Sequence, residues 1–165
     1  MVSLQPRPHS NQIAIGISNP HQESEKGIEL LDLDTGNFES ITKIKEPDIN
    51  WQSMFWSPDG SKLLISAINA AQRWLEWQFW DGQSHQVINQ FLPAREQLFY
   101  LHFFEQFRLS HPILSTDNKH FYFSAYEPPH KRREFPPKPW VYRGSFESKN
   151  EFERLHIGLF PVLSP

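Results

Sequence analysis

A short strand–turn–strand pattern occurs three times along the chain, and this repetition limits the folds that the chain can adopt. In the clearest copy, the aromatic run 51–56 precedes the turn residues Ser57-Pro58-Asp59-Gly60, and the apolar run 63–65 follows them. Proline, aspartate and glycine in this order are typical of a tight turn between two strands. Related turns begin near positions 8 and 116, so the copies are spaced 50 and 58 residues apart.

A second turn occurs later in each copy and divides the remainder into two more strands. These turns contain Asp34-Thr35-Gly36, Asp81-Gly82 and Arg143-Gly144, each after an apolar or aromatic run. Fourth-strand candidates follow at 38–44, 85–91 and 146–154. A unit of four short strands in roughly 40 to 50 residues is the blade of a β-propeller.

Residues 55–66, FWSPDGSKLLIS, are the most distinctive part of the repeat. They resemble the TolB-like propeller repeat, which also occurs in the N-terminal propellers of dipeptidyl-peptidase-type enzymes. The run 31–36, LDLDTG, is similar to the third-strand signature of that repeat. The resemblance implies an all-β fold, a partial β-propeller of about three four-stranded antiparallel blades plus one extra strand. It implies no particular activity, because one fold hosts many functions.

The repeat predicts one partial-propeller domain over residues 1–165. Its expected parts are blade 1 at about 2–45, blade 2 at about 50–92, an inserted segment at 93–108, blade 3 at about 109–154 and the start of a fourth blade at 155–165. Propellers typically have about four to eight blades, so three blades do not close a ring. We therefore expect either the remaining blades of a longer propeller or a homodimer that closes a six-bladed ring.

The inserted segment is expected to form a short helix near 95–107. Its residues recur at helical spacing rather than in strict alternation, as in the sets Leu98, Leu101 and Glu105, and Phe99, Phe103 and Phe107. A long aromatic strand is the alternative. An insertion in a regular scaffold often carries function, so this segment is an expected contact surface.

Two strands carry signals for packing between blades. In the run 12–17, the small residues Ala14 and Gly16 alternate with isoleucines, which predicts a close approach of a neighbouring sheet. In the run 73–80, aromatic rings occur at both odd and even positions. The second pattern predicts a strand that is buried on both faces.

Composition excludes some partners and sites. A net charge of −3 and a pI near 6.2 provide no general attraction to nucleic acid or to anionic lipid. The chain has no cysteine, so disulfides and thiolate metal sites are excluded. There is no secretory-signal pattern and no apolar run of about 20 residues. We expect a soluble cytoplasmic protein, with the cell envelope as the alternative if the chain is a fragment.

The first candidates for partner binding lie in and after the proline-rich stretch 126–139. The basic and aromatic residues there are Lys131, Arg132, Arg133, Lys138 and Trp140. Such a patch suits an acidic partner, although a solvated loop would have the same composition.

The second candidates are His102, Glu105 and His111, the nearest approach to a metal-ligand group. Their spacing lacks the tight pairs that zinc sites use. We interpret these residues as a polar helix flank with a histidine at a strand entry. We therefore expect no metal and no other cofactor.

Other polar and aromatic residues have structural interpretations. We expect Asp32, Asp34 and Asp59 to bond to turn backbone rather than to act in catalysis. Trp74, Trp80 and Trp140 would form a stacking surface for sugars if exposed, and core packing is the favoured alternative.

No Gly-x-Ser-x-Gly motif occurs in the chain, and a peptidase with this kind of propeller would need a separate α/β-hydrolase domain. The sequence therefore predicts a non-catalytic propeller module that binds a protein partner. One alternative is a fragment of the substrate-filtering propeller of a serine peptidase. Another is a propeller that binds a carbohydrate or a small ligand.

Overall fold

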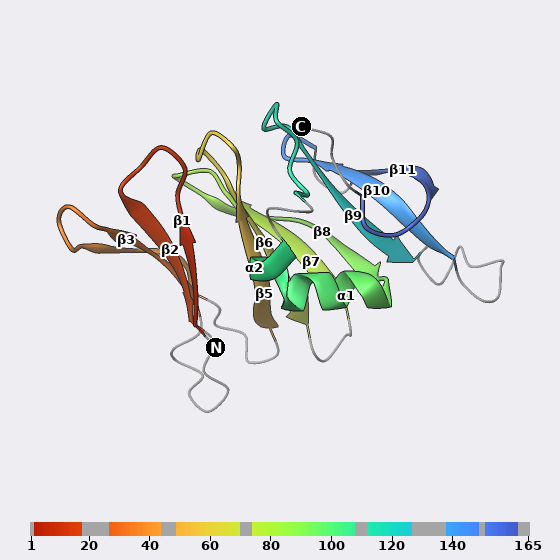
Figure 1. Ribbon diagram of the computed structural model, residues 1–165, viewed down its shortest axis with the longest axis horizontal. Coiled ribbons are helices and arrows are strands. Elements are labelled where there is room, and N and C mark those ends of the chain that lie inside the picture. The colour runs from red at the N-terminus through yellow and green to blue at the C-terminus, as the bar shows by residue number, and fades with distance from the viewer. Residues whose placement is uncertain are drawn as a thin grey trace.

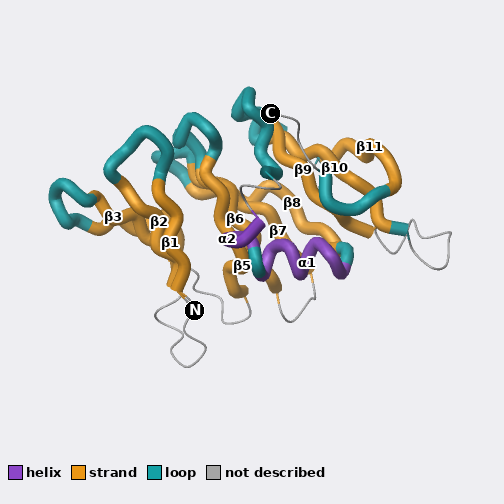
Figure 2. The backbone as a smooth tube through the Cα atoms, viewed as in Figure 1, coloured by secondary structure: helices purple, strands orange, loops and turns teal. Residues whose placement is uncertain are grey.

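The computed structural model describes residues 2–17, 27–43, 49–69, 74–107, 112–126, 138–148 and 151–161. Its strands form two antiparallel sheets, one of four strands and one of seven. The sheets follow one another along an arc (Figure 1). Two helices lie beside the sheets, and most of the short turns point to one side of the arc (Figure 2). The predicted all-β partial β-propeller is confirmed.

Blade 1 is the four-stranded sheet, and each strand pairs with the next along the chain. Its strands are β1 (Val2–Pro6), β2 (Gln12–Ile17), β3 (Gly27–Asp32) and β4 (Phe38–Lys43). Gly16 faces the next blade, because a Cβ atom there would lie 2.7 Å from the Trp51 ring. The Trp51 indole Nε1 also donates to the Ile17 carbonyl at 2.8 Å. The predicted close approach at the small residues of β2 is confirmed.

Blade 2 comprises β5 (Ile49–Trp56), β6 (Leu63–Asn69), β7 (Trp74–Trp80) and β8 (His85–Pro93). All residues of β7 after Trp74 are buried, as the rings on both of its faces predict. Trp77 stacks on Phe91 of β8 with ring centroids 5.6 Å apart. Its ring also meets Phe121 at 5.4 Å and Phe123 at 5.7 Å, both of which belong to blade 3. Aromatic packing therefore joins blades 2 and 3.

Blade 3 contains β9 (His120–Tyr126), β10 (Pro139–Ser145) and β11 (Phe152–Ile157). The prediction that its last strand covers 146–154, with a fourth blade starting at 155, is wrong. Phe146 instead turns into the core, with its ring 5.6 Å from Phe79 and 5.5 Å from Phe121. Because the Phe146 ring packs into the core, the last strand begins later in the sequence than predicted, at Phe152, and Leu155 lies within it.

The inserted segment divides the first strand of blade 3, whereas we expected it between blades 2 and 3. Before the insertion, residues 92–93 at the end of β8 pair with residues 125–126 of β9. After it, Leu114 pairs with Phe121 at the other end of β9. β8 continues without interruption from Phe91, which pairs with Leu75 of β7, to Leu92, which pairs with Tyr126 of β9, so this strand runs from blade 2 into blade 3. The two blades consequently share one seven-stranded sheet.

The insertion folds as α1 (Arg95–His102) and α2 (Phe104–Phe107), which confirms the predicted helix. Tyr100 of α1 stacks on Phe55 of β5 at 6.1 Å, and Phe104 meets the same ring edge-on at 5.3 Å. The Gln97 side-chain oxygen accepts a hydrogen bond from the Ser124 backbone N–H at 2.7 Å. These contacts fix the helices against blades 2 and 3. Neither helix within the described ranges is long and apolar enough to span a bilayer.

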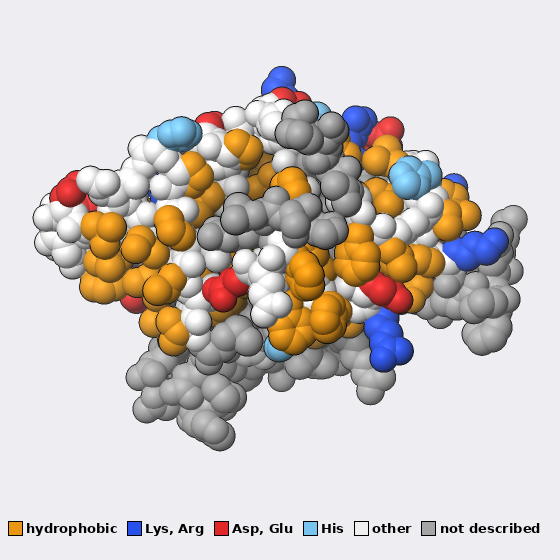
Figure 3. All heavy atoms as spheres, in the orientation of Figure 1, with side chains coloured by type: hydrophobic (Ala, Val, Ile, Leu, Met, Phe, Trp, Pro, Cys, Tyr) orange, Lys and Arg blue, Asp and Glu red, His pale blue; other side chains and the backbone are white. Residues whose placement is uncertain are grey.

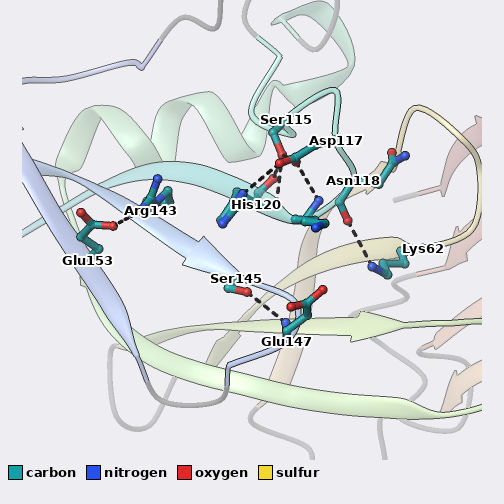
Figure 4. A network of polar contacts seen from close by, with 10 residues as sticks. Lys62, Ser115, Asp117, Asn118, His120, Arg143, Ser145, Glu147 and Glu153 are labelled. Atoms are coloured by element: carbon teal, nitrogen blue, oxygen red, sulfur yellow. Dashed lines mark hydrogen bonds and ion pairs between the residues drawn. The ribbon is translucent and has the colours of Figure 1, made fainter.

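The repeated turns of blades 2 and 3 make the same hydrogen bonds. The backbone N–H of Lys62 donates to Ser57 Oγ at 2.9 Å, and Asp59 accepts from the backbone N–H of Ser61 at 2.9 Å. In blade 3, Ser115 and Asp117 occupy the equivalent positions and accept from His120 and Lys119 (Figure 4). Asp32 accepts from Thr35 in the same manner. The turn role predicted for Asp32 and Asp59 is confirmed, whereas the Asp34 carboxylate accepts from the Asn11 side-chain amide at 3.1 Å.

The turns also bond to one another across blades. The Arg7 Nε atom donates to the Gly60 carbonyl at 2.7 Å. The Lys62 ammonium donates to the Asn118 carbonyl at 3.1 Å, as Figure 4 shows. These two hydrogen bonds join the repeated turns of the three blades into one series along the same edge of the arc.

We expect Asp117 to titrate with a midpoint of about 2, as measured by carboxyl ¹³C NMR. A hydrogen bond from Ser115 Oγ and one from the Lys119 backbone N–H lower its pKa from 3.8. Because the folded pKa is the lower one, its contribution to stability is present above pH 3.8 and disappears as pH falls through about 2. Ser115→Ala should move the midpoint upward. An unchanged midpoint in that variant would contradict the assigned cause.

Candidate functional site

An aromatic pocket of about 380 Å³ lies beside the inserted helices. Glu96, Phe99, Tyr100, Phe107 and Phe160 line it, and we call these residues the aromatic pocket. Figure 3 shows hydrophobic side chains gathered over the helices on this side of the molecule, with acidic side chains next to them. Pockets for small ligands typically measure about 300 to 1,000 Å³, so the volume of this pocket lies near the lower end of that range.

The helix positions three of these side chains by its periodicity. Glu96, Phe99 and Tyr100 are three and four residues apart on α1, so they share one helix face. Tyr100 is fixed by its stacking on Phe55 of β5. Burial raises the pKa of the Tyr100 phenol well above its usual range, so the ring carries no charge.

Phe107 and Phe160 complete the wall of the pocket. The Phe107 ring lies 6.1 Å from Tyr100 and 6.2 Å from Phe99, while Phe160 lies 6.4 Å from Tyr100. Phe160 comes from the chain beyond β11, where its backbone N–H donates to Ser124 Oγ at 3.2 Å. Two segments far apart in sequence therefore build one site.

The surface of the pocket is almost wholly apolar, and its lining residues include the polar side chains Glu96 and Tyr100. Rings attract apolar groups and, through their negative faces, cations. Among the described residues of the lining, Glu96 is the one charged side chain.

A second unusual surface is the open face of blade 1. The strand register places the following residues on one side of that sheet: Val2, Leu4, Ile13, Ile15, Ile17, Leu31 and Phe38. Val2 is 66% exposed and Phe38 is 61% exposed. Exposed apolar faces of this kind usually mark an interaction surface.

The corresponding face of blade 2 is covered by blade 1. There, the Trp56 indole Nε1 donates to the Gln5 carbonyl at 3.0 Å. The Arg7 guanidinium lies 5.2 Å from the Trp56 ring and 5.7 Å from the Trp80 ring. By the repeat, the open face of blade 1 is the side on which a preceding blade would pack.

The terminal face of blade 3 has a different character. Gly158 donates from its backbone N–H to the Pro139 carbonyl at 3.1 Å, and Phe160 reaches Ser124 as described above. The chain beyond β11 thus returns over this face. An Arg143–Glu153 ion pair joins β10 to β11 (Figure 4). The two ends of the arc are consequently unlike, one apolar and open, the other polar and partly covered.

The structure separates His102 from Glu105. His102 is exposed and packs edge-on against Phe103 at 4.7 Å, whereas Glu105 accepts a hydrogen bond from Ser3 Oγ of β1. His111 lies outside the described residues. No cluster of three metal-ligating side chains occurs in the described part of the chain. The hydrogen bond from Ser3 to Glu105 therefore joins α2 to blade 1.

The basic candidates are only partly described. Lys131, Arg132 and Arg133 lie outside the described residues. Lys138 is exposed directly before β10, and Trp140 is half-buried with the Arg154 guanidinium 4.2 Å from its ring centroid.

The tryptophans predicted as an alternative sugar-stacking surface do not form one. Trp80 is 4% exposed and packs edge-on against Trp56 at 6.1 Å, so the core-packing interpretation holds for this residue. Trp74 is half-buried at the start of β7. Trp140 lies in blade 3.

The aromatic pocket itself was not predicted as a site. The sequence predicts a contact surface in this region because the segment 95–107 is an insertion in a regular scaffold. Glu96 and Phe160 carried no signal of their own, because their place in the pocket depends on how α1 begins and on the chain reversal after β11.

Comparisons with known proteins identify the fold. Neither a scan against protein-family models nor a search of curated proteins gave a match. Among solved structures, the chain is similar to oligogalacturonate lyase from Vibrio parahaemolyticus, with 14% identity and a TM-score of 0.60. It is also similar to the β-propeller domain of the Trilobed protease from Pyrococcus furiosus, with 17% identity and a TM-score of 0.57. TolB from Acinetobacter baumannii gives 20% identity and a TM-score of 0.53.

The alignments cover 94%, 94% and 87% of this chain, but only 36%, 43% and 30% of the three similar chains. The chain thus spans less than half the length of each. At such identities the likeness establishes the fold alone. The protein therefore has the β-propeller fold that these proteins share, in the form of a partial propeller.

Proposed function

We propose that this chain is a non-catalytic propeller module that binds a protein partner through the aromatic pocket. The observation that carries the proposal is a pocket of about 380 Å³ walled by four aromatic rings on an inserted pair of helices. Large rings in a preformed pocket are the usual anchors of protein interfaces. The basic residues Lys131, Arg132, Arg133 and Lys138 remain a predicted contact surface of the same module.

The open face of blade 1 supports a further part of this proposal. We assign it to an additional blade, supplied either by a longer chain or by a second copy in a six-bladed ring. Val2, Leu4 and Phe38 would become buried there, as Trp80 is buried and Trp56 is partly buried between blades 1 and 2. A head-to-tail ring would also require the segment after β11 to leave the terminal face of blade 3.

A second function is favoured by the likeness to the propeller domain of the Trilobed protease. In this alternative, the chain is part of a propeller that filters substrates for a peptidase whose catalytic domain lies elsewhere. A binding partner with an α/β-hydrolase domain would support it. A partner without hydrolase activity would favour the interaction module.

Phe99→Leu is expected to weaken partner capture by roughly tenfold or more, because it removes an anchor ring from the pocket. The measurement is quantitative pull-down from cells of the source organism, with captured proteins identified by mass spectrometry. Leu98→Ala is the control, since Leu98 is 38% exposed on the same helix but does not line the pocket. Equal loss in both variants, or no loss in Phe99→Leu, would contradict the proposal.

A further inference from the structure

The segment 158–161 combines a strained backbone with a place in the wall of the aromatic pocket. Phe160 has φ of +51°, in the left-handed region that residues other than glycine rarely adopt. His9 and Asn118 are the other described non-glycine residues with positive φ, and both belong to residue types that adopt it more readily. A bulky aromatic residue does not, so the backbone of Phe160 is held in a costly conformation.

The contacts that hold this segment against its strain are modest. The Phe160 backbone N–H donates to Ser124 Oγ at 3.2 Å, and the Gly158 backbone N–H donates to the Pro139 carbonyl at 3.1 Å. The side chains of Leu159 and Phe160 are both exposed, so they bury little apolar surface. Segments with few buried apolar contacts open locally at a free energy well below that of global unfolding.

The residue that receives the segment is firmly placed. Ser124 lies in β9 and is 1% exposed, and its backbone N–H donates to the Gln97 side chain at 2.7 Å. Its carbonyl accepts from the Ala94 backbone N–H, directly before α1, at 3.4 Å. Release of the segment breaks the contact with the Ser124 hydroxyl and leaves these two backbone contacts with the helix region intact.

The position of the segment decides whether the pocket is complete. The Phe160 ring lies 6.4 Å from the Tyr100 ring and lines the pocket. The other described lining residues belong to the inserted helices α1 and α2. When the segment leaves blade 3, the pocket loses the wall that the helices do not supply.

We propose that residues 158–161 form a strap that opens and closes over blade 3 and thereby regulates the aromatic pocket. In the closed position, which the structure shows, Phe160 completes the pocket and its backbone is strained. In the open position the strain is released and the pocket lacks this wall. A partner that contacts Phe160 binds the closed position better and therefore shifts the strap toward closure. The proposal rests on the proposed function, since the regulated site is the pocket that we assign to a protein partner.

The strap also links the pocket to the end of the arc. The head-to-tail ring described above needs the same segment to leave the terminal face of blade 3. A partner in the pocket favours the closed position, whereas an added blade favours the open one. Each therefore opposes the binding of the other.

The test compares two versions of the whole protein that differ in one stereocentre. An expressed segment 1–147 is joined to a synthetic peptide 148–165 that carries either L-phenylalanine or D-phenylalanine at position 160, with Ser148→Cys as the joining site in both. A D-residue favours positive φ, so it keeps the ring and removes the strain. We expect hydrogen exchange of the amide at position 160, followed by NMR, to slow by about five- to thirtyfold in the D-phenylalanine version. Exchange of the Ser124 amide, which bonds to Gln97, should not change.

Ser124→Ala provides a second variant with the opposite expected effect. It removes the acceptor of the Phe160 N–H and keeps the two backbone contacts of residue 124, so exchange at Phe160 should accelerate by roughly two- to tenfold. Partner capture should weaken in parallel, because the complete pocket is populated less. Ser145→Ala is the matched control, since Ser145 Oγ accepts from the Glu147 backbone N–H at the end of β10.

Two results would overturn the strap. Unchanged exchange at position 160 in the D-phenylalanine version would show that no strain is stored there. Equal exchange rates at Phe160 and Ser124 would show that the segment opens only with global unfolding. If exchange follows the prediction but Phe99→Leu leaves partner capture unchanged, the movement of the strap stands and the proposed function fails. If exchange contradicts the prediction while Phe99→Leu weakens capture, the strap fails and the proposed function stands.

Discussion

Trp77→Ala is expected to lower the free energy of unfolding by about 3–5 kcal/mol, the usual cost of deleting a large buried ring. Trp77 is fully buried and contacts Phe91 within blade 2 as well as Phe121 and Phe123 of blade 3. The substitution therefore opens a cavity where the two blades meet. Since small domains are stable by only about 5–15 kcal/mol, a large part of the stability is lost. Urea denaturation followed by circular dichroism measures the change.

Two further variants make this result specific. Trp74→Ala removes a half-buried ring from the start of the same strand and should cost far less. Trp77→Phe should also be milder, because the indole N–H of Trp77 has no hydrogen-bond partner among the described residues and ring packing is largely kept. Similar losses in Trp77→Ala and Trp74→Ala would contradict a central role for the ring contacts between blades.

Gly60→Ala is expected to lower the free energy of unfolding by roughly 3 kcal/mol, from two causes. Gly60 has φ of +70°, a conformation that costs an alanine about 1–2 kcal/mol. A Cβ atom there would also lie 2.5 Å from the Pro8 carbonyl oxygen, in the turn of the preceding blade. Backbone must then move, and such overpacking typically costs a further 1–3 kcal/mol or so.

Gly36→Ala is a matched control for this prediction. Gly36 has φ of +71°, but a Cβ atom there would meet nothing within 4 Å. The control therefore carries the backbone cost without the overlap, and it should lose about 1–2 kcal/mol. The free energy of unfolding of both variants is measured by urea denaturation. Equal decreases at the two glycines would show that the Pro8 turn of blade 1 moves away from the added Cβ atom at little cost, so that the contact between the turns is not rigid.

The repeat could be predicted because its signals are local. Ser57, Asp59 and Gly60 form their turn through hydrogen bonds that reach at most five residues, so spacing in the sequence reports the structure directly. The last strand of blade 3 gave no comparable signal. Residues 153–157 of β11 are exposed, so no buried–exposed alternation marks the strand, and the inward turn at Phe146 shifts its start.

The candidate site was predictable only in part. The spacing of Leu98, Leu101 and Glu105 identified the helix, and the unusual insertion identified the region. The pocket, however, also needs Phe160, which reaches α1 through the reversal of the chain after β11 and its hydrogen bond to Ser124. A contact across some sixty residues depends on tertiary packing, for which local spacing carries no information.

The unlike ends of the arc limit how copies of the protein can associate. Filaments grow when each subunit offers two different, mutually complementary surfaces, so that every addition leaves a new site for the next. In the described part of this chain, the apolar side of blade 1 is free, while the opposite end is occupied by the segment around Gly158. Copies that meet through the free side use the same patch twice, which is an isologous contact. Such a pair has two-fold symmetry and ends assembly at two subunits. It is an alternative to the proposed six-bladed ring, which requires the segment around Gly158 to leave the end of blade 3.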